Sequence, residues 1–233
     1  YKIKGIVDLE VSTEQDLPEY QLIVKRERAS DRNLGTVNLV STIGALVGGQ
    51  VVSTYEDQEG EAVDVRVRVL VRLDPAQPLS RWQISIEGAR NLTLVQAHFP
   101  RVLNLPRQED EYLAVPAWMG QQAADPRKLL AGPEGRGRRY EWGYPGQLSL
   151  QCMAYYRSNG PGLYVAADDT ATFRKAFACF GDAEGNASCE LVHFPEKRGQ
   201  PDRRWTVPYQ VLLGTFQGDW LTAAEQYRAW ATN

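Results

Sequence analysis

The sequence has little of what a nucleic-acid-binding or membrane-spanning protein needs. Its net charge at pH 7 is −3, and its 26 lysine and arginine residues form no run that is set apart from acidic residues. Binding to nucleic acid normally requires a basic excess. The longest mildly apolar segment, 37–52, is interrupted by polar residues and glycines and is shorter than the roughly 20 apolar residues of a membrane span. We therefore expect neither nucleic acid nor a membrane as a partner.

Cysteine and histidine are also scarce, which argues against a metal site. The chain has three cysteines and two histidines and no CxxC pair, so we expect no zinc site and no cofactor. Cys152 lies in an apolar run and is expected to be a buried thiol. Cys179 and Cys189 flank a turn-rich stretch, so a disulfide between neighbouring strands is geometrically possible, but it requires a register that the sequence leaves open.

What the sequence does contain is material for one large globular core. Hydrophobic residues make up 43% of its 233 residues, which excludes disorder as a description of the chain. Segment 62–73 alternates strictly between valine on one side and mostly arginine on the other, a pattern typical of a half-buried strand. We predict that Val63, Val65, Val67, Val69 and Val71 share the buried face, with Arg66, Arg68 and Arg72 on the solvated face.

The same period of two recurs along the chain and predicts an antiparallel β protein. The expected strands are 3–11, 20–28, 51–55, 62–73, 81–87, 92–99, 148–156, 162–167, 172–180, 187–193 and 206–216. Between 101 and 147 we find no period, and we expect a long irregular segment that is either functional or covered by a partner. Only 219–232 has helical spacing, with Asp219 as its N-cap. The fold class predicted is mainly β, a large two-sheet antiparallel sandwich over 1–217 followed by one helix over 218–233.

The apolar stripe of that helix allows a finer expectation. Trp220, Ala223, Ala224, Tyr227 and Trp230 recur on one face, so packing has to hold a helix this short. We expect Tyr227 and one of the two tryptophans to pack on the sandwich, while the other tryptophan keeps an exposed ring. Because the chain opens in a strand pattern and stops just after the helix, we expect it to be a fragment whose localisation signals lie outside it.

Five short motifs resemble the N-terminal β-supersandwich of large bacterial glycoside hydrolases. They are 115–120 (VPAWMG), 144–146 (YPG), 151–156 (QCMAYY), 162–169 (GLYVAADD) and 218–230 (GDWLTAAEQYRAW). The resemblance covers roughly 81–233 and implies a supersandwich of the galactose-mutarotase-like superfamily. It further implies that a catalytic (β/α)8 barrel of the same parent chain follows, that 218–233 is the linker helix leading to it, and that the catalytic carboxylates lie beyond Asn233.

The acidic and imidazole groups of this chain do not predict a catalytic site. Glycoside hydrolysis uses two carboxyl groups that face each other, whereas Asp168 and Asp169 would point to opposite faces of one strand. We expect them to cap backbone amides in a turn; the alternative is that one of them binds a sugar or the barrel. The acidic run 109–111 is expected at a solvated edge. His98 and His193 are expected to be structural, so no mutarotase activity is predicted.

An aromatic and arginine cluster is the best candidate for a contact with carbohydrate. Sugars present flat C–H faces that pack on aromatic rings, and their hydroxyl groups accept hydrogen bonds from arginine. The same residue types are enriched at interfaces between domains, so both interpretations stay open. The candidate residues for either role are Trp118, Arg138, Arg139, Tyr140, Trp142 and Tyr144, together with Asp168 and Asp169.

These observations favour a non-catalytic sandwich domain of a glycoside hydrolase, which supports the barrel and lends residues to carbohydrate binding. Two alternatives remain: an autonomous carbohydrate-binding module and a structural spacer between domains. A groove lined by Trp118, Trp142 and Tyr144 would favour carbohydrate binding. An apolar patch beside the C-terminal helix would favour docking of another domain. The sugar, the linkage and the stereochemistry of hydrolysis are not encoded in this chain.

Overall fold

The computed structural model describes residues 51–56, 62–73, 78–87, 93–196 and 204–232, with only the backbone described for residues before 65. These residues belong to one compact unit, Ala45–Asn233. The strands expected over 3–11 and 20–28, and the side chain of Val63, lie outside the described residues. Within the described part, no helix has the length and apolarity needed to cross a membrane.

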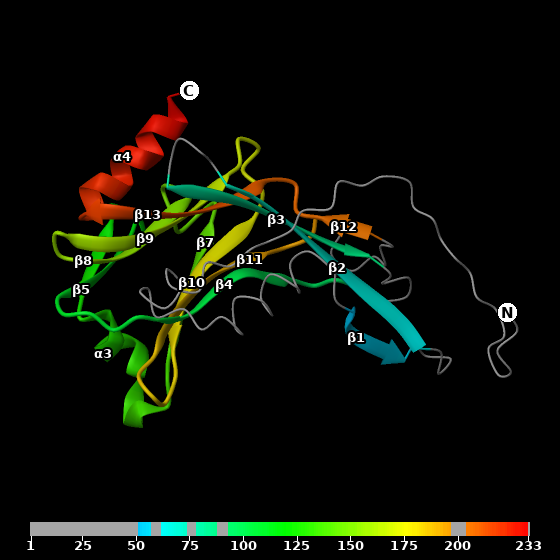
Figure 1. The fold of residues 1–233 in the computed structure, drawn as a ribbon, viewed down its shortest axis with the longest axis horizontal. Helices are drawn as coiled ribbons and strands as arrows, with labels where there is room; N and C mark the ends of the chain where they lie inside the picture. Colours follow the sequence, from blue (N-terminus) through cyan, green and yellow to red (C-terminus); the bar gives the residue numbers. More distant parts are fainter. Residues whose placement is uncertain (1–50, 57–61, 74–77, 88–92, 197–203, 233) are drawn as a thin grey trace, which may run out of the picture. The chain divides into compact units, whose positions relative to one another are not determined.

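Most of the strands belong to a nine-stranded antiparallel sheet (Figure 1). Their spatial order is β1 (Val51–Glu56), β2 (Ala62–Leu73), β3 (Leu79–Glu87), β13 (Gln210–Gly218), β9 (Gly160–Asp168), β8 (Cys152–Arg157), β5 (Glu111–Val115) and β6 (Gln121–Ala124). The short strand β12 (Arg204–Thr206) pairs with β3 beside β13. Several pairs, such as β1–β2, β2–β3, β5–β6 and β8–β9, join strands that are consecutive along the chain, whereas β13 pairs with the distant strands β3 and β9.

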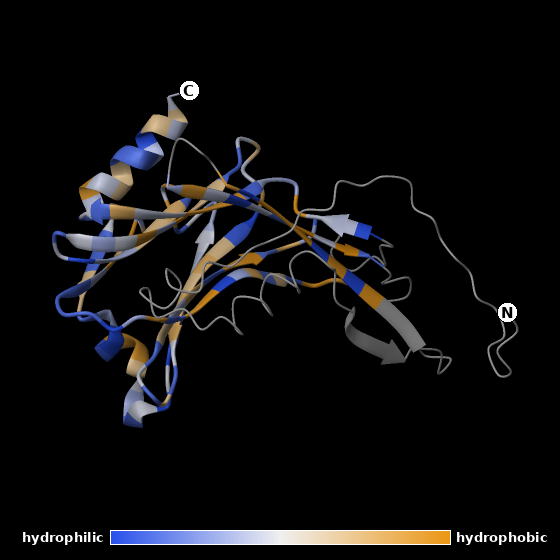
Figure 2. Ribbon diagram, in the orientation of Figure 1, coloured by the Kyte–Doolittle hydropathy of each residue, from blue (hydrophilic) through white to orange (hydrophobic). Residues whose placement is uncertain are grey.

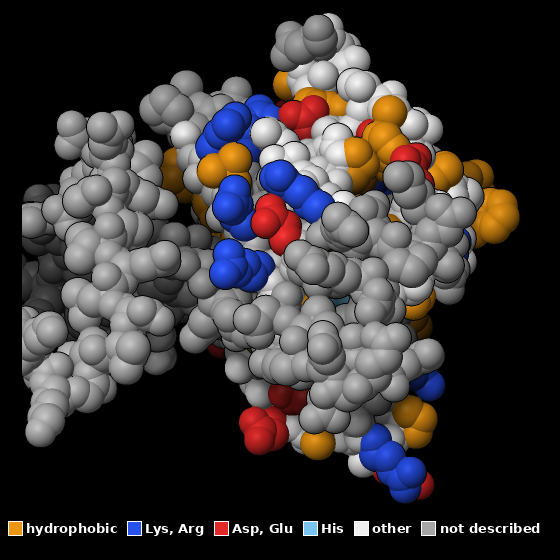
Figure 3. Space-filling view, turned by 90° about the vertical axis from the view of Figure 1, so that its right-hand side faces the viewer, with side chains coloured by type: hydrophobic (Ala, Val, Ile, Leu, Met, Phe, Trp, Pro, Cys, Tyr) orange, Lys and Arg blue, Asp and Glu red, His pale blue; other side chains and the backbone are white. Residues whose placement is uncertain are grey.

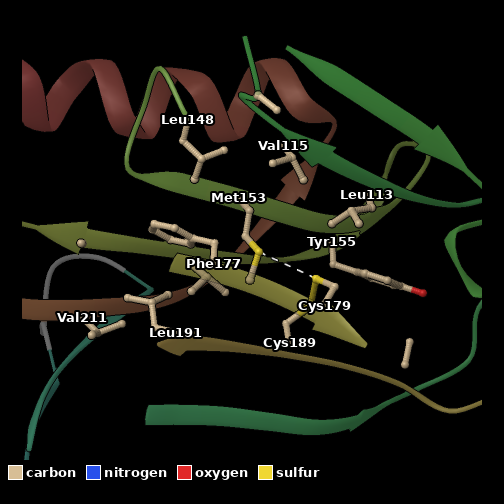
Figure 4. Close-up of a cluster of buried hydrophobic side chains, with 14 of the residues drawn as sticks. Leu113, Val115, Leu148, Met153, Tyr155, Phe177, Cys179, Cys189, Leu191 and Val211 are labelled. Carbon is tan, nitrogen blue, oxygen red and sulfur yellow. Dashed lines mark hydrogen bonds between the residues drawn. A yellow bond between two sulfur atoms is a disulfide. The ribbon is translucent and has the colours of Figure 1, made fainter. Parts of the chain in front are cut away.

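A four-stranded antiparallel sheet packs against the inner face of the first. Its order is β4 (Ala97–Leu105), β11 (Ala187–His193), β10 (Lys175–Gly181) and β7 (Arg139–Tyr144). Between the sheets lies the main core, in which Met153 of β8 faces Cys179 of β10 (Figure 4). Hydrophobic residues follow the strands that line this space (Figure 2). The predicted two-sheet, mainly β sandwich is therefore confirmed.

The C-terminal helix α4 (Trp220–Ala231) covers part of the outer face of the nine-stranded sheet, where it contacts β13 and β8 (Figure 1). Asp219 is its N-cap, and its side chain accepts a hydrogen bond from the backbone N–H of Leu221. Small residues beneath the helix, such as Ala154 and Ala166, form a second buried cluster with Ala223 and Tyr227. Strand β8 is consequently buried on both faces, which explains its unbroken apolar sequence.

Segment 62–73 confirms the predicted phase but not the predicted depth of burial. Val65, Val67, Val69 and Val71 are half-buried, whereas Arg66, Arg68 and Arg72 are exposed. Val67 and Val69 pack against the main core. Figure 3 views the molecule from the right-hand side of Figure 1, where β2 and β12 lie. The described residues on this side include both basic and acidic side chains. The face opposite the valines is therefore an ordinary solvated surface.

The prediction of a long irregular segment over 101–147 was wrong. This span contains the end of β4, the strands β5, β6 and β7, the short helix α3 (Pro126–Ala131) and a 3-10 turn at Pro133–Gly135. Its strands are only four to six residues long, too short for their alternation to stand out between prolines and glycines. In β7 the period of two is present, because Tyr140 and Trp142 pack toward the core between exposed Arg139 and Glu141.

Two open questions about side chains are also answered. Cys179 and Cys189 are directly opposite each other in the β10–β11 register and form a disulfide, while Cys152 is a free, buried thiol. The acidic run 109–111 is not entirely a solvated edge, since Glu111 is buried. Its carboxylate pairs with Arg127 at 2.6 Å and accepts a hydrogen bond from the Tyr155 hydroxyl at 3.0 Å, and these partners offset the cost of burying the charge.

Candidate functional site

Asp168 and Asp169, at the end of β9, serve different faces of the sheet. Asp168 accepts hydrogen bonds from Arg81 Nη1 at 2.6 Å and, on the side of the C-terminal helix, from Trp230 Nε1 at 2.9 Å. Asp169 turns inward, where it is buried beside Lys175. The two carboxylates therefore do not converge, as the alternation of the strand predicted. This pair cannot supply the two facing groups that glycoside hydrolysis uses.

Asp169 is part of a buried polar cluster centred on Lys175. The carboxylate accepts hydrogen bonds from two backbone N–H groups in the following turn, those of Ala171 at 2.9 Å and Phe173 at 2.7 Å. The expected turn cap is therefore confirmed for Asp169. Lys175 Nζ also donates to Gln151 Oε1 at 2.8 Å. The carboxylate of Asp169, the ammonium group of Lys175 and the amide of Gln151 all have hydrogen-bond partners. The cluster is therefore a structural link between β8, β9 and β10.

Tyr144, one of the candidate residues, belongs to this same cluster. Lys175 Nζ lies 4.8 Å from the ring centre of Tyr144 and 4.4 Å from that of Tyr209, distances typical of cation–π contacts. Burial lowers the pKa of Lys175, and the hydrogen bond with Asp169 opposes that shift. The face of the Tyr144 ring is therefore already in contact with a lysine of the same chain.

The two histidines lie in different environments. Nε2–H of the buried His193 donates to the Phe99 carbonyl, so Nδ1 accepts from the Tyr209 hydroxyl at 2.6 Å. Burial lowers the pKa of His193 to about 4. Its role is structural, as predicted. His98 is half-exposed and hydrogen-bonds through Nδ1 to Glu190.

The sequence analysis did not single out Glu190, which forms an ion pair with Arg139, one of the candidate arginines. Arg101 and Arg139 each contact its carboxylate at 2.6 Å. Burial by itself would raise the pKa of Glu190, but hydrogen bonds from His98 and Arg139 bring it below its ordinary value. The signal in the sequence was a single acid among the mostly apolar residues of β11. Arg139 therefore points away from Arg138 and Tyr140.

Tyr140 and Trp142 line a cleft between the two sheets. Their rings are stacked, with centres 6.1 Å apart and planes inclined by 15°, and the Arg138 guanidinium lies 5.7 Å from the Tyr140 ring centre. The cleft has a volume of about 390 Å³. Its other wall is β6, and α3 closes one side. The cleft is lined by Leu113, Val115, Gln121, Gln122, Ala123, Pro126, Leu129, Leu130, Tyr140 and Trp142.

Trp118 lies elsewhere, in a groove beside the C-terminal helix. This groove has a volume of about 410 Å³ and runs between the β5–β6 turn and the first half of α4. Its rim exposes 76% of Trp118, 102% of Met119 and 50% of Trp220. No charged residue lines it. The structure therefore separates the three aromatic residues that the sequence grouped: Trp118 is in the groove, Trp142 is in the cleft, and Tyr144 contacts Lys175.

The helix confirms the expectation for its aromatic residues. Tyr227 packs into the cluster beneath the helix, Trp230 is half-buried and bonded to Asp168, and Trp220 keeps an exposed ring. Among the described residues there is no group of three or more histidine, cysteine or acidic side chains that could hold a metal ion.

Comparison with known proteins gives a similarity to solved structures. The chain matches no protein-family model and no curated protein. Among solved structures, it is similar to the GH36 α-galactosidase AgaA from Geobacillus stearothermophilus, with a TM-score of 0.41 and 13% sequence identity over 75% of this chain. The chain spans 26% of the length of that protein. A similarity of this size establishes neither a family nor an activity for the chain.

Proposed function

We propose that this chain is a non-catalytic sandwich domain of a glycoside hydrolase, and that the groove beside α4 receives the (β/α)8 barrel of the same parent chain. The observation that carries the proposal is the exposed apolar rim of the groove, formed by Trp118, Met119 and Trp220. Large exposed apolar patches on a soluble domain mark surfaces that another surface covers. The resemblance of 218–230 to a helix that leads into a barrel supports the same partner.

The chemistry of the groove supports docking rather than hydrolysis. No carboxylate lines it, whereas hydrolysis of a glycosidic bond uses two. The centres of protein interfaces are depleted of charge and enriched in tryptophan and methionine, which matches Trp118, Met119 and Trp220. The buried carboxylates of the described residues are also engaged elsewhere, since Glu111, Asp169 and Glu190 each pair with a lysine or an arginine.

An autonomous carbohydrate-binding module is the second candidate, and one observation favours it. Trp118 and Trp220 present exposed rings to the same groove, next to the amide of Gln122 and the hydroxyl of Ser149. Rings flanked by amides and hydroxyls also suit a sugar. The two candidates differ in what protects the groove: a domain of the same polypeptide or a soluble glycan.

The test compares the 233-residue chain with the longer protein that the proposal predicts, in which a barrel follows Asn233. Hydrogen exchange should be slower over 115–122 and 220–224 in the longer protein, because a docked barrel excludes water from those amides. Exchange around Leu103, an exposed residue of β4, should stay the same.

A double variant sharpens the comparison. Trp118→Ser with Trp220→Ser in the longer protein should remove the added protection and increase binding of a hydrophobic dye, whereas Leu103→Ser should do neither. The proposal is wrong if the gene encodes no barrel in this region or if the groove exchanges equally in both proteins. Protection of the short chain by a soluble glycan alone would favour the binding module instead.

A further inference from the structure

We propose that the cleft between β6 and β7 is a separate binding site for one unit of a neutral saccharide. The cleft and the groove beside α4 share Val115, Gln121 and Gln122 of β5 and β6. Only the cleft has Tyr140 and Trp142 in its lining, however, and the proposal does not depend on a docked barrel. It follows from the position of the cleft in the sheets, from its lining and from the hydrogen-bonding groups left free within it.

The cleft exists because two terminal strands face each other without pairing. In the described part of the chain, β6 pairs with β5 and β7 pairs with β10, and each is the last strand of its sheet. The helix α3, which contacts β5 and β10, lies between them. A rigid framework therefore holds the two walls apart and leaves a hollow of about 390 Å³, within the range of roughly 300–1,000 Å³ found for small-molecule sites.

The residues that line the cleft favour an uncharged ligand that has both flat apolar faces and hydroxyl groups. Tyr140 and Trp142 form one wall with stacked rings, Leu129 contributes an exposed apolar side chain, and no charged residue is among the lining residues. Aromatic rings provide large contact areas for C–H faces at low cost in side-chain entropy. No residue that lines the cleft supplies a counter-ion to a charged ligand; the guanidinium of Arg138, beside the Tyr140 hydroxyl, belongs to an exposed residue outside the lining.

Polar groups in the cleft remain available for hydroxyl groups of a ligand. The indole Nε1–H of the half-buried Trp142 makes no hydrogen bond to any described residue, and neither does the exposed amide of Gln121. The Tyr140 hydroxyl accepts from Arg138 Nη1 at 2.9 Å, which leaves its own proton free to donate. The residues that line the cleft thus supply two donors from β7 and one amide from β6 among apolar side chains. An apolar site with a few polar groups can fix a sugar ring in one orientation.

The groove beside α4 differs from the cleft in how firmly its rings are held. Its exposed rings and Met119 form a rim at the surface, whereas Tyr140 and Trp142 are half-buried and held by packing against the core. Rings that packing already fixes lose little entropy when a ligand binds. The cleft therefore suits a small rigid ligand, and the groove suits a large surface.

The test is calorimetric titration of the chain with neutral oligosaccharides, namely cellohexaose, xylohexaose, mannohexaose, maltohexaose and raffinose. At concentrations of about 10 mM, at least one should bind, since even a Kd of roughly 1 mM is then detected. Gln121→Ala and Trp142→Phe should each weaken that binding roughly three- to tenfold, the effect of one lost hydrogen bond. Trp142→Phe keeps an aromatic ring, so the loss reports on the indole N–H rather than on the core.

The matched control is Trp118→Ala, which removes an exposed indole from the groove and leaves the cleft intact. It should leave saccharide binding unchanged. Absence of heat with all five saccharides would overturn the proposal. So would binding that Trp118→Ala abolishes while Gln121→Ala and Trp142→Phe leave it unchanged. Either result would leave barrel docking at the groove untouched, because exchange protection in the longer protein tests that separately.

Discussion

The two faces of the nine-stranded sheet are completed in different ways. The inner face is covered by a second sheet, and its buried charges are matched by partners, as Lys175 is by Asp169 and Gln151. The outer face is covered in its described part by one twelve-residue helix, which leaves the groove with Trp118 and Trp220 on its rim. The difference indicates that the inner face holds the fold together, whereas the outer face is the surface that the proposed barrel would cover.

Among the substitutions that test this comparison, we expect the largest loss of stability at Lys175. Lys175→Met leaves the buried carboxylate of Asp169 without its cation, and breaking a buried pair in this way typically costs about 3–5 kcal/mol. We expect the urea midpoint of unfolding to fall accordingly. The double variant Lys175→Met with Asp169→Asn should recover part of that loss, because no charge then remains unpaired.

An exposed ion pair provides the matched control. Lys128 pairs with Asp125 at 2.7 Å, but its side chain is 83% exposed. Lys128→Met should therefore change stability by less than about 0.5 kcal/mol. If Lys128→Met lowers the stability as much as Lys175→Met does, the view that the inner face holds the fold together is wrong.

The second effect is a dependence of stability on pH that comes from His193. Burial lowers the pKa of His193 to about 4, below the ordinary value near 6.5, so the unfolded chain binds a proton that the folded chain does not. This contribution to stability is complete above pH 6.5 and is lost as the pH falls toward 4. It amounts to at most about 3 kcal/mol, since one pKa unit corresponds to 1.36 kcal/mol.

Urea unfolding measured at pH 7 and at pH 4.5 checks this expectation. His193→Gln removes the titrating group, so the variant should lose this part of the pH dependence even if it is less stable at both pH values. A variant with the same pH dependence as the parent chain would show that other groups cause it.

The fold was predictable from local patterns where strands were long or followed clear breaks. The alternation of 62–73 gave the correct phase of its side chains, and Asp219 with the stripe of Trp220 and Tyr227 gave the C-terminal helix. The short strands β5, β6 and β7 were missed because four to six residues contain too few alternations. Their pairing with distant strands, which the sequence does not display, holds them in place.

The candidate site was less predictable, because it depends on which side chains meet in space. The sequence grouped Trp118, Trp142 and Tyr144 by proximity along the chain. Trp118, however, lies past the end of β5, and Tyr144, although it shares a face of β7 with Trp142, lies against Lys175. Glu190 and Lys175 looked like ordinary strand residues. Only the register of neighbouring strands reveals that Arg139 contacts Glu190 and that Lys175 lies against Tyr144.

The smallest effect that we expect is a difference in stability between variants at the two ends of the C-terminal helix. Trp230→Phe keeps an aromatic ring next to Tyr227 but removes the hydrogen bond to Asp168. We expect a loss of about 1 kcal/mol, the usual net value of one hydrogen bond. Trp220→Phe should change stability by less than about 0.5 kcal/mol, because half of that ring is exposed.

Urea unfolding followed by circular dichroism measures both variants against the unchanged chain. Since the two substitutions are chemically identical, any difference between them comes from the surroundings of each ring and not from the loss of an indole as such. If Trp220→Phe costs as much as Trp230→Phe, the first turn of the helix is held by contacts within this chain. The rim of the groove would then be part of the sandwich rather than a surface left for a second domain, and the proposed docking of a barrel would lose the observation that carries it.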